Sequence, residues 1–308
     1  MARDKICSLS EAVASVPDGA NMTFGGFAAY FTPMAFVREM IRQGKRDIEM
    51  TSVAECWVAD HLAGAGRLRR ARFSNFMFEG MGRCYNFSRG VERGEIAVED
   101  YSHFAITSRL VAAGLGIPFL PIKPMAGTDL MNTRGFEAEK ARPFACPFTG
   151  ESVLLVPAAR PDVAVIHAAR ADRDGNAQLF GNTCVIDEQG RAASRVIVTV
   201  EEIVDDGVIR QQPELTVLPG FLVDALVEVP FGAHPTGMYR YYDPDFAFLT
   251  DYYAASRDEA AFRRYLDEYV FDVADHWAYL RKIGIRRLMA LRADPGLGLA
   301  RIHARTLS

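Results

Sequence analysis

Short apolar runs alternate along the chain with segments of helical periodicity. In the first half, runs at 22–24, 47–53 and 72–78 predict strands. Ser8-Leu9-Ser10-Glu11 is a capping-box pattern that predicts a helix over 9–16. A second helix is expected from Thr32 as cap and Pro33 as first residue to a stop at Gly44, and a third over 101–115.

The second half carries longer apolar runs, at 152–156, 163–167, 196–200 and 222–229, of the kind found in strands covered on both faces. The proline-rich segment 117–121 is expected at a sheet edge or in a connection, 172–176 forms a turn, and 257–284 reads as helical. This alternation predicts an α/β fold: an open, mainly parallel sheet with helices on both faces. We expect one domain over 1–308, with any minor subdivision near 140–150.

Composition and charge exclude some partners. The 308 residues are 49% hydrophobic and 24% charged, which is ample for a large core, and the net charge is −4 with a pI near 5.9. Nucleic acid or an anionic membrane would favour a basic face, so neither is an expected partner. The short cluster of Arg67, Arg69, Arg70 and Arg72 is expected to be a solvated helix or loop end.

The five cysteines are scattered, without a Cys-x-x-Cys pair or a spacing that suits zinc, so reduced thiols and no metal are expected. No apolar run approaches the length of about 18 residues that a membrane span needs, and the first residues lack a signal-peptide core. The expected compartment is the cytoplasm.

Gly25-Gly26-Phe27, directly after a predicted strand, is the most informative stretch of the chain. Adjacent glycines let the backbone approach a ligand closely, at the edge where open α/β sheets place their sites. A purely structural turn is the alternative. Neither a Gly-x-Gly-x-x-Gly pattern nor a Walker loop is present, so nucleotide phosphate is not the first expected ligand.

Several segments together resemble the A subunit of a family I coenzyme A transferase, most closely the glutaconate CoA-transferase type. They span nearly the whole chain in the order found in the family: the opening 18–33, VEDYS at 98–102, GIPFLPI at 116–122, PDVAVIHA at 161–168, VTVEEIV at 198–204, PFGAHP at 230–235 and PGLGL at 295–299.

The resemblance implies a fold and a mechanism. In the family, a glutamate carboxylate on the second polypeptide, the B subunit, attacks an acyl-CoA, and CoA then converts the mixed anhydride into a glutamyl-CoA thioester. The Ser-Glu-Asn-Gly setting of that glutamate is absent from this chain. The resemblance therefore implies an obligate B subunit of the same fold, a heterotetramer or larger assembly, CoA thioester as substrate, and no permanently bound cofactor.

The candidate site residues follow from this resemblance. Gly25, Gly26 and Phe27 are expected to wall the acid and thioester pocket, with Tyr101 and Ser102 as further substrate contacts at a helix start. Glu79 and His103 are the candidate catalytic side chains; Glu79 alternatively pairs with Arg83, and His103 alternatively has a structural role.

Two other functions stay open at this point. One is a CoA-thioester hydrolase or ring-opening carbon–carbon lyase of the steroid-degradation type, which would use Glu79 or His103 and no glutamyl-CoA. The other is a non-catalytic regulatory role, because related folds serve several functions.

Overall fold

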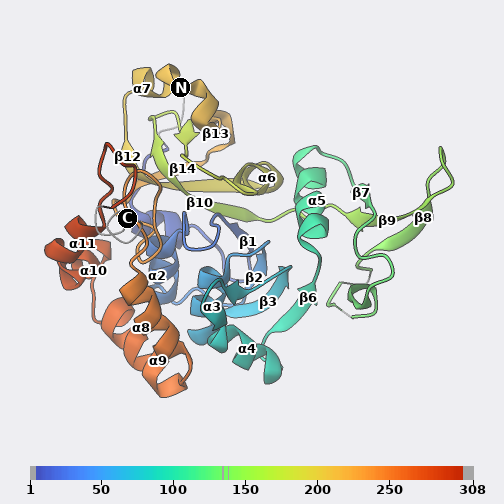
Figure 1. Cartoon of the computed structure of the whole chain (residues 1–308), viewed down its shortest axis with the longest axis horizontal. Coiled ribbons are helices and arrows are strands. Elements are labelled where there is room, and N and C mark those ends of the chain that lie inside the picture. The colour runs from blue at the N-terminus through green and yellow to red at the C-terminus, as the bar shows by residue number, and fades with distance from the viewer. Residues whose placement is uncertain (1–4, 134, 138, 301–308) are drawn as a thin grey trace.

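The computed structural model describes residues 5–133, 135–137 and 139–300, and its centre is a nine-stranded, mainly parallel sheet (Figure 1). The parallel strands lie in the order β14-β12-β10-β1-β2-β3-β6, and β11 and β13 extend the sheet antiparallel from the end of β10. Their bounds are β1 Asn21–Phe24, β2 Ile48–Thr51, β3 Leu68–Phe73, β6 Ala97–Asp100, β10 Val163–Ala171, β11 Ala177–Gln178, β12 Arg195–Ile203, β13 Thr216–Leu218 and β14 Ala225–Glu228. The predicted fold class is confirmed.

Strand β10 shows why both faces of the sheet are covered. Successive side chains of a strand point to opposite faces. Val163 and Val165 belong to one buried core, whereas Ala164 and Ile166 belong to a second core on the other face. A near-continuous apolar run such as 163–169 can be buried only if helices or loops cover each face.

Helices supply these covers (Figure 1). Side chains of α1, α2 and α3 share the first core with β1 and β2, and Ile186 of α6 lies in the second. The helices are α1 Leu9–Ala14, α2 Met34–Arg42, α3 Cys56–Gly64, α4 Tyr85–Glu92, α5 His103–Gly114, α6 Ile186–Ala192, α7 Asp206–Gln211, α8 Phe246–Ser256, α9 Glu259–Leu266, α10 His276–Ile283 and α11 Ile285–Leu291. Among the described residues, no helix has both the length and the apolar character that crossing a membrane requires.

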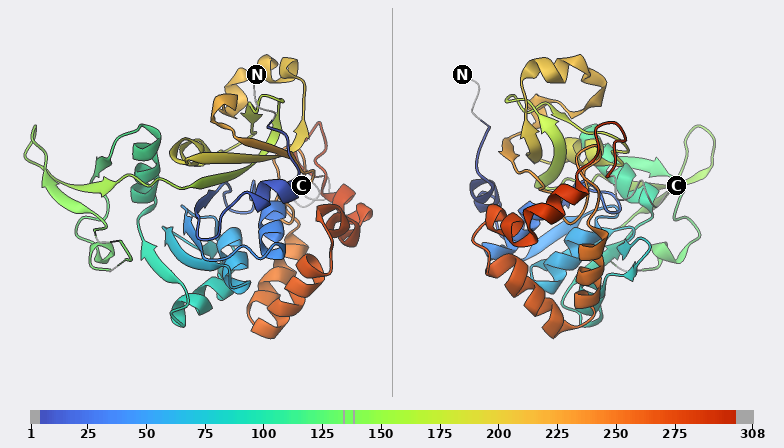
Figure 2. Two further views of the ribbon diagram at one scale, coloured as in Figure 1. Left: turned by 180° about the vertical axis from the view of Figure 1, so that it is seen from behind. Right: turned by 60° about the vertical axis from the view of Figure 1, so that its left-hand side comes forward.

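A small antiparallel sheet projects from the body of the molecule (Figures 1 and 2). It consists of β7 Phe119–Ile122, β9 Ser152–Pro157 and β8 Arg142–Ala145, in that order. β7 is an edge strand, as its prolines predicted. The run 152–156 was expected to be covered on both faces; this is wrong, because alternate residues of β9 are only partly buried and β9 belongs to the projecting sheet.

The arginine-rich segment before Phe73 departs from the prediction. It is not a solvated end: residues 68–73 form β3, and the predicted strand 72–78 is replaced by the end of β3 and the short strands β4 Met77–Phe78 and β5 Gly82–Arg83. The charges are tolerated because they are paired: Arg72 contacts Glu49 on β2 and, at 2.6 Å, Glu137. A charged side chain can be buried only with such partners.

The helix ends follow local signals in most places. The capping box of α1 is present, and Ser102 caps α5 by accepting from the Ala105 N–H. In α2 the prediction is off by one residue: Met34 is the first helical residue and Pro33 is the cap, without a side-chain hydrogen bond. The predicted helical region 257–284 contains α9, a π-helix at Asp267–Phe271, and α10, which ends at Ile283 with Gly284 as its cap.

Candidate functional site at the carboxyl edge of the sheet

The parallel topology brings several predicted site segments to one edge. Strands β1, β2, β3 and β6 run in the same direction, so the residues after Phe24, Thr51, Phe73 and Asp100 all lie at their carboxyl ends. Three strand spacings separate β1 from β6, which is roughly 14 Å at about 4.8 Å per strand. The glycine turn and the start of α5 therefore share an edge without being neighbours.

The glycine turn leaves a single N–H among its first three residues for a ligand. The Gly25 N–H donates to the Val165 carbonyl at 2.8 Å, and the Phe27 N–H donates to the Tyr30 carbonyl at 3.0 Å. The Gly26 N–H is buried and has no hydrogen-bond partner among the described residues. Gly26 also has a φ of +142°, which side chains rarely adopt. A buried donor without a partner is a ready contact for a ligand oxygen.

Three non-glycine residues in or near this turn have left-handed backbone conformations. Ala28 and Phe31, both within the loop, have φ values of 53° and 63°, and Cys184, in the loop that precedes α6, has a φ of 50°. Left-handed conformations cost non-glycine residues roughly 1–3 kcal/mol each, and they cluster at ligand-binding sites. The observed strain therefore agrees with a site role for this loop.

Glu55 lies behind the turn and was not singled out from the sequence. Its side chain is only 3% exposed, and a Cβ placed on Gly26 would lie 3.6 Å from Glu55 Cγ. Burial raises the pKa of this carboxyl to about 7, although hydrogen bonds from Ala54, Gln189 and Val53 lower it in part. The only available sequence signal is a lone acid in the apolar stretch after β2, which is too weak to identify a site.

Tyr101 lies beneath the edge, inside a network of charged side chains. Its ring is 1% exposed; its hydroxyl donates to Glu99 and accepts from Arg109. Arg109 in turn donates to Glu137 at 3.0 Å. Because its hydroxyl bonds both Glu99 and Arg109, Tyr101 is held in place and can orient the start of α5, which follows it in the chain.

Ser102 and His103 mark the start of α5. Ser102 Oγ accepts from the Ala105 N–H at 3.1 Å, so its capping role is confirmed. The next residue, His103, is exposed and lies on the first turn of the helix. It can therefore meet a molecule that approaches this edge.

Glu79 is exposed in the turn between β4 and β5. The suggested ion pair between Glu79 and Arg83 is wrong, because Arg83 is paired with Glu92 of α4. Glu79 has no hydrogen bond or ion pair with another described residue.

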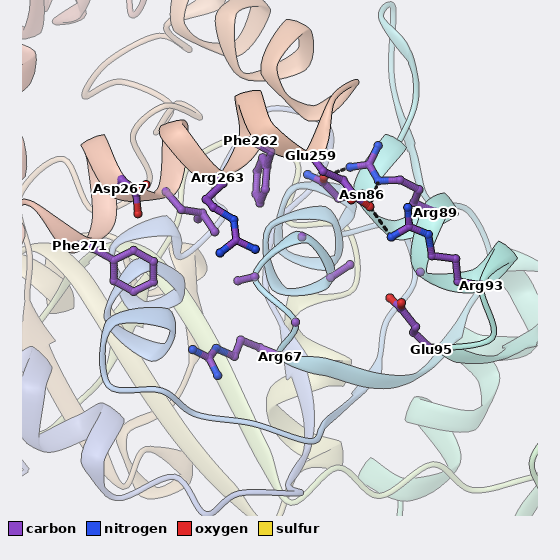
Figure 3. A pocket seen from close by; sticks show the side chains of 16 residues that line it. Arg67, Asn86, Arg89, Arg93, Glu95, Glu259, Phe262, Arg263, Asp267 and Phe271 are labelled. Atoms are coloured by element: carbon purple, nitrogen blue, oxygen red, sulfur yellow. Dashed lines mark hydrogen bonds and ion pairs between the residues drawn. The ribbon is translucent and has the colours of Figure 1, made fainter.

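A separate cavity of about 410 Å³ lies at the opposite edge of the sheet, where β3 begins (Figure 3). Arg89 of α4 contacts Asn86 there, and Arg93, the residue that follows α4, contacts Glu259, as the dashed lines show. Arg67 and Arg263 share the cavity with Glu95 and Asp267, so charges of both signs line it. It is remote from the glycine turn, which we take as the candidate site.

In the described part of the chain, no group of three or more His, Cys, Asp or Glu side chains is placed to hold a metal ion. The candidate site offers a backbone donor, a buried carboxyl and nearby amide groups instead. Of these groups, the N–H donors bind carboxylate or thioester oxygens through hydrogen bonds.

Comparisons with known proteins give a consistent family. A family model described as Coenzyme A transferase matches residues 6–229. The A subunit of glutaconate CoA-transferase from Acidaminococcus fermentans is 36% identical, with 96% of each chain covered. The A subunit of 3-oxoadipate CoA-transferase from Pseudomonas knackmussii is also 36% identical, over 91% of this chain and 98% of that protein. These matches confirm the resemblance found in the sequence motifs.

The solved structure of glutaconate coenzyme A-transferase from A. fermentans agrees over 98% of this chain and 99% of that chain, with a TM-score of 0.91 and 35% identity. A 38% identical, uncharacterized protein from Archaeoglobus fulgidus is longer: the match spans 95% of this chain but 66% of that protein. The cholesterol ring-cleaving hydrolase IpdA subunit from Rhodococcus jostii is 28% identical over 89% of this chain.

Proposed function

Because the chain belongs to the coenzyme A transferase family, we propose that it is the A subunit of a two-subunit CoA-transferase that moves CoA from an acyl-CoA donor to a carboxylic acid. The observation that carries the proposal is the 36% identity to the A subunit of a glutaconate CoA-transferase over 96% of both chains. The hydrolase and lyase alternative is not favoured, since the IpdA subunit is only 28% identical.

The proposed reaction needs a nucleophile from the partner. A glutamate carboxylate of the B subunit attacks the donor thioester carbonyl, so that a mixed anhydride forms and CoA leaves as thiolate. The thiolate then attacks the glutamyl carbonyl, which gives glutamyl-CoA and releases the donor acid as carboxylate. The acceptor carboxylate passes through the same two steps in reverse and leaves as acyl-CoA. CoA thioester is thus a substrate, and the mechanism requires no permanent cofactor.

Within this proposal, the present chain supplies walls and hydrogen-bond donors. We assign substrate binding to Gly25, Gly26 and Phe27, with the Gly26 N–H as the donor to the carbonyl or carboxylate oxygen. The buried, unpartnered state of that N–H supports the assignment.

The start of α5 and the turn between β4 and β5 supply the other proposed contacts. Tyr101 and Ser102 would orient the start of α5. His103 on that helix and Glu79 in that turn are the proposed acid and base groups of this chain. The exposed position of both His103 and Glu79 supports a role at the contact with the B subunit rather than in a closed pocket.

The projecting sheet supports a protein partner. Its inner face, with Leu154 and Val156, packs with α5, whereas its outer face carries partly exposed Phe119 and Phe144, and Phe148 at the hairpin tip is 93% exposed. Surfaces of this kind mark contacts between proteins. We therefore propose an obligate complex with a B subunit of the same fold, assembled as a heterotetramer or larger.

Co-expression tests the function. The chain together with a B subunit should exchange CoA between acetyl-CoA or succinyl-CoA and dicarboxylic or oxo acids, and neither polypeptide should be active alone. Borohydride treatment after addition of acyl-CoA should inactivate the complex by reducing a thioester on the B subunit. Full transferase activity of this chain alone, or hydrolysis without any trapped thioester, would refute the proposal.

A further inference from the structure

The buried carboxyl of Glu55 is placed to control the glycine turn. Glu55 is the residue before α3, and its side chain turns back toward the end of β2. Oε2 accepts from the Val53 and Ala54 N–H groups at 3.1 and 3.2 Å. These bonds fix one carboxylate oxygen against its own loop and leave the other to face α6.

Gln189 of α6 connects this second oxygen to β1. Its Nε2 donates to Glu55 Oε1 at 3.1 Å and to the Phe24 carbonyl at 2.8 Å. Phe24 is the residue directly before Gly25, so the amide ties the carboxylate to the start of the turn. Gln189 Oε1, by contrast, is buried and has no hydrogen-bond partner among the described residues.

The protonation state of Glu55 determines which hydrogen bonds the Gln189 amide makes. An ionised carboxylate only accepts, and it meets three N–H donors here. A protonated carboxyl has an O–H that needs an acceptor, and Gln189 Oε1 is the unpaired acceptor beside it. If the amide turned over to accept that proton, Nε2 would release the Phe24 carbonyl. The two states of Glu55 thus favour two arrangements of the turn.

The titratable neighbours of Glu55 lie in the loop before α6, in α6 and at the start of α3. Burial and the charge of Glu55 raise the pKa of the Cys184 thiol, in the loop before α6, to about 11, so it stays protonated near neutrality. Glu188 of α6 acts on Cys184 as a smaller influence. On the α3 side the next residue is Cys56, which is buried. Burial raises the pKa of the Glu55 carboxyl itself to about 7.

We propose that Glu55 is a positioning residue whose ionised carboxylate, acting through Gln189, holds the Gly25-Gly26 turn in the geometry that binds substrate. This inference rests on the proposed function for its link to catalysis. Its link to the turn itself can be measured without any reaction.

Trp57 provides that independent measurement. It lies two residues after Glu55, and its indole N–H donates to the Ala28 carbonyl inside the loop at 2.9 Å. The chain contains one other tryptophan, the exposed Trp277. In full-length Trp277→Phe protein, we expect the emission of Trp57 to change with a midpoint near pH 7. The same protein carrying Glu55→Gln should show no transition.

Activity gives the second measurement. In the complex with the B subunit, kcat/KM of the wild type should fall about tenfold per pH unit below about pH 7. Glu55→Gln places an amide NH₂ against Gln189 Nε2 and so imitates the protonated state. It should lower kcat/KM ten- to a hundredfold at pH 8 and flatten the acid side of the profile. Gln189→Ala should do the same, and the double variant should be no worse than either single one.

Glu201→Gln is the matched control. Glu201 is another buried carboxylate that accepts backbone N–H bonds, from Phe231 and Gly232. It should change stability but keep both the fluorescence transition and the acid limb. If Glu55→Gln or Gln189→Ala retains the pH 7 transition of Trp57, the inference is refuted. If the transition depends on Glu55 but the wild-type complex transfers no CoA, the proposed function fails and the positioning of the turn stands.

Discussion

Replacing Gly26 by alanine tests the glycine turn most directly. At a φ of +142°, an alanine is strained whatever space surrounds it, and its Cβ would lie 3.0 Å from Thr32 Oγ1 and 3.4 Å from Thr32 Cα. Strain of this kind costs about 1–3 kcal/mol. An unfolding entropy of about 2.1 cal/mol/K per residue gives roughly 0.65 kcal/mol/K for this chain, so Tm should fall by about 2–5 °C.

The same substitution should lower activity by more than the stability loss implies. The added methyl group displaces the turn or Thr32, and a shift of about 1 Å at a binding group can cost on the order of 10²-fold in rate. Thermal unfolding followed by circular dichroism gives the first quantity, and kcat/KM of the complex with the B subunit gives the second.

Alanine substitutions at two further glycines distinguish the effect of backbone strain on stability from the effect of the site on activity. Gly44, just after α2, has a φ of +74° and no atom within 4 Å of an added Cβ, so Gly44→Ala should lose about 1 kcal/mol of stability and no activity. A Cβ on Gly25 would make ordinary contacts, at 3.4 and 3.5 Å, with Ile166 and Ile186, so Gly25→Ala should leave Tm nearly unchanged. Wild-type Tm and full kcat/KM in Gly26→Ala would refute the reasoning.

Three other expectations concern stability and assembly. Burial raises the pKa of Asp245, but hydrogen bonds, among them the pair from Arg287, outweigh it and hold the pKa below its ordinary value. The stability that Asp245 contributes is thus present above about pH 4 and is lost as the pH falls further. The free energies of unfolding of wild type and Arg287→Ala, measured in urea, should therefore become equal as the pH approaches about 2. Arg38 is fully buried, with its guanidinium 3.7 Å from the centroid of the Tyr279 ring. Arg38→Ala should therefore lower the free energy of unfolding by roughly 3 kcal/mol in the same assay. A loss below about 1 kcal/mol would contradict a stabilising role for Arg38. Phe144→Ser on the outer face of the projecting sheet should weaken co-purification with the B subunit without lowering the Tm of the chain alone, and unchanged binding would remove that face from the proposed contact.

Local pattern fails at β3 for a physical reason. Leu68–Phe73 contains three arginines, and a strand of the central sheet is normally apolar. The Arg72 guanidinium can be buried only because the carboxylates of Glu49 and Glu137 pair with it. These residues lie 23 and 65 positions away from Arg72 in the sequence. Such pairing depends on contacts that are distant in sequence, so no local window contains it.

At the candidate site, too, the sequence indicates the turn, whereas contacts between distant segments determine its hydrogen bonding. The double glycine after a strand marked the turn, because only glycine readily adopts the φ of +142° found at Gly26. Which N–H remains unpaired depends on Val165 and Tyr30, which take the neighbouring donors. The role of Glu55 depends on Gln189, which lies 134 positions away and reaches it only when α6 packs on the sheet.

The sequence by itself determined the alternation of strands and helices, the edge at which the glycine turn lies, and the family, because these depend on local periodicity and on motifs that stay in order along the chain. The tertiary structure alone decided which charges are buried, which backbone donor is unpaired, and which carboxyl lies behind the turn. Those properties arise from the solvent exclusion and contacts that form when distant segments pack together.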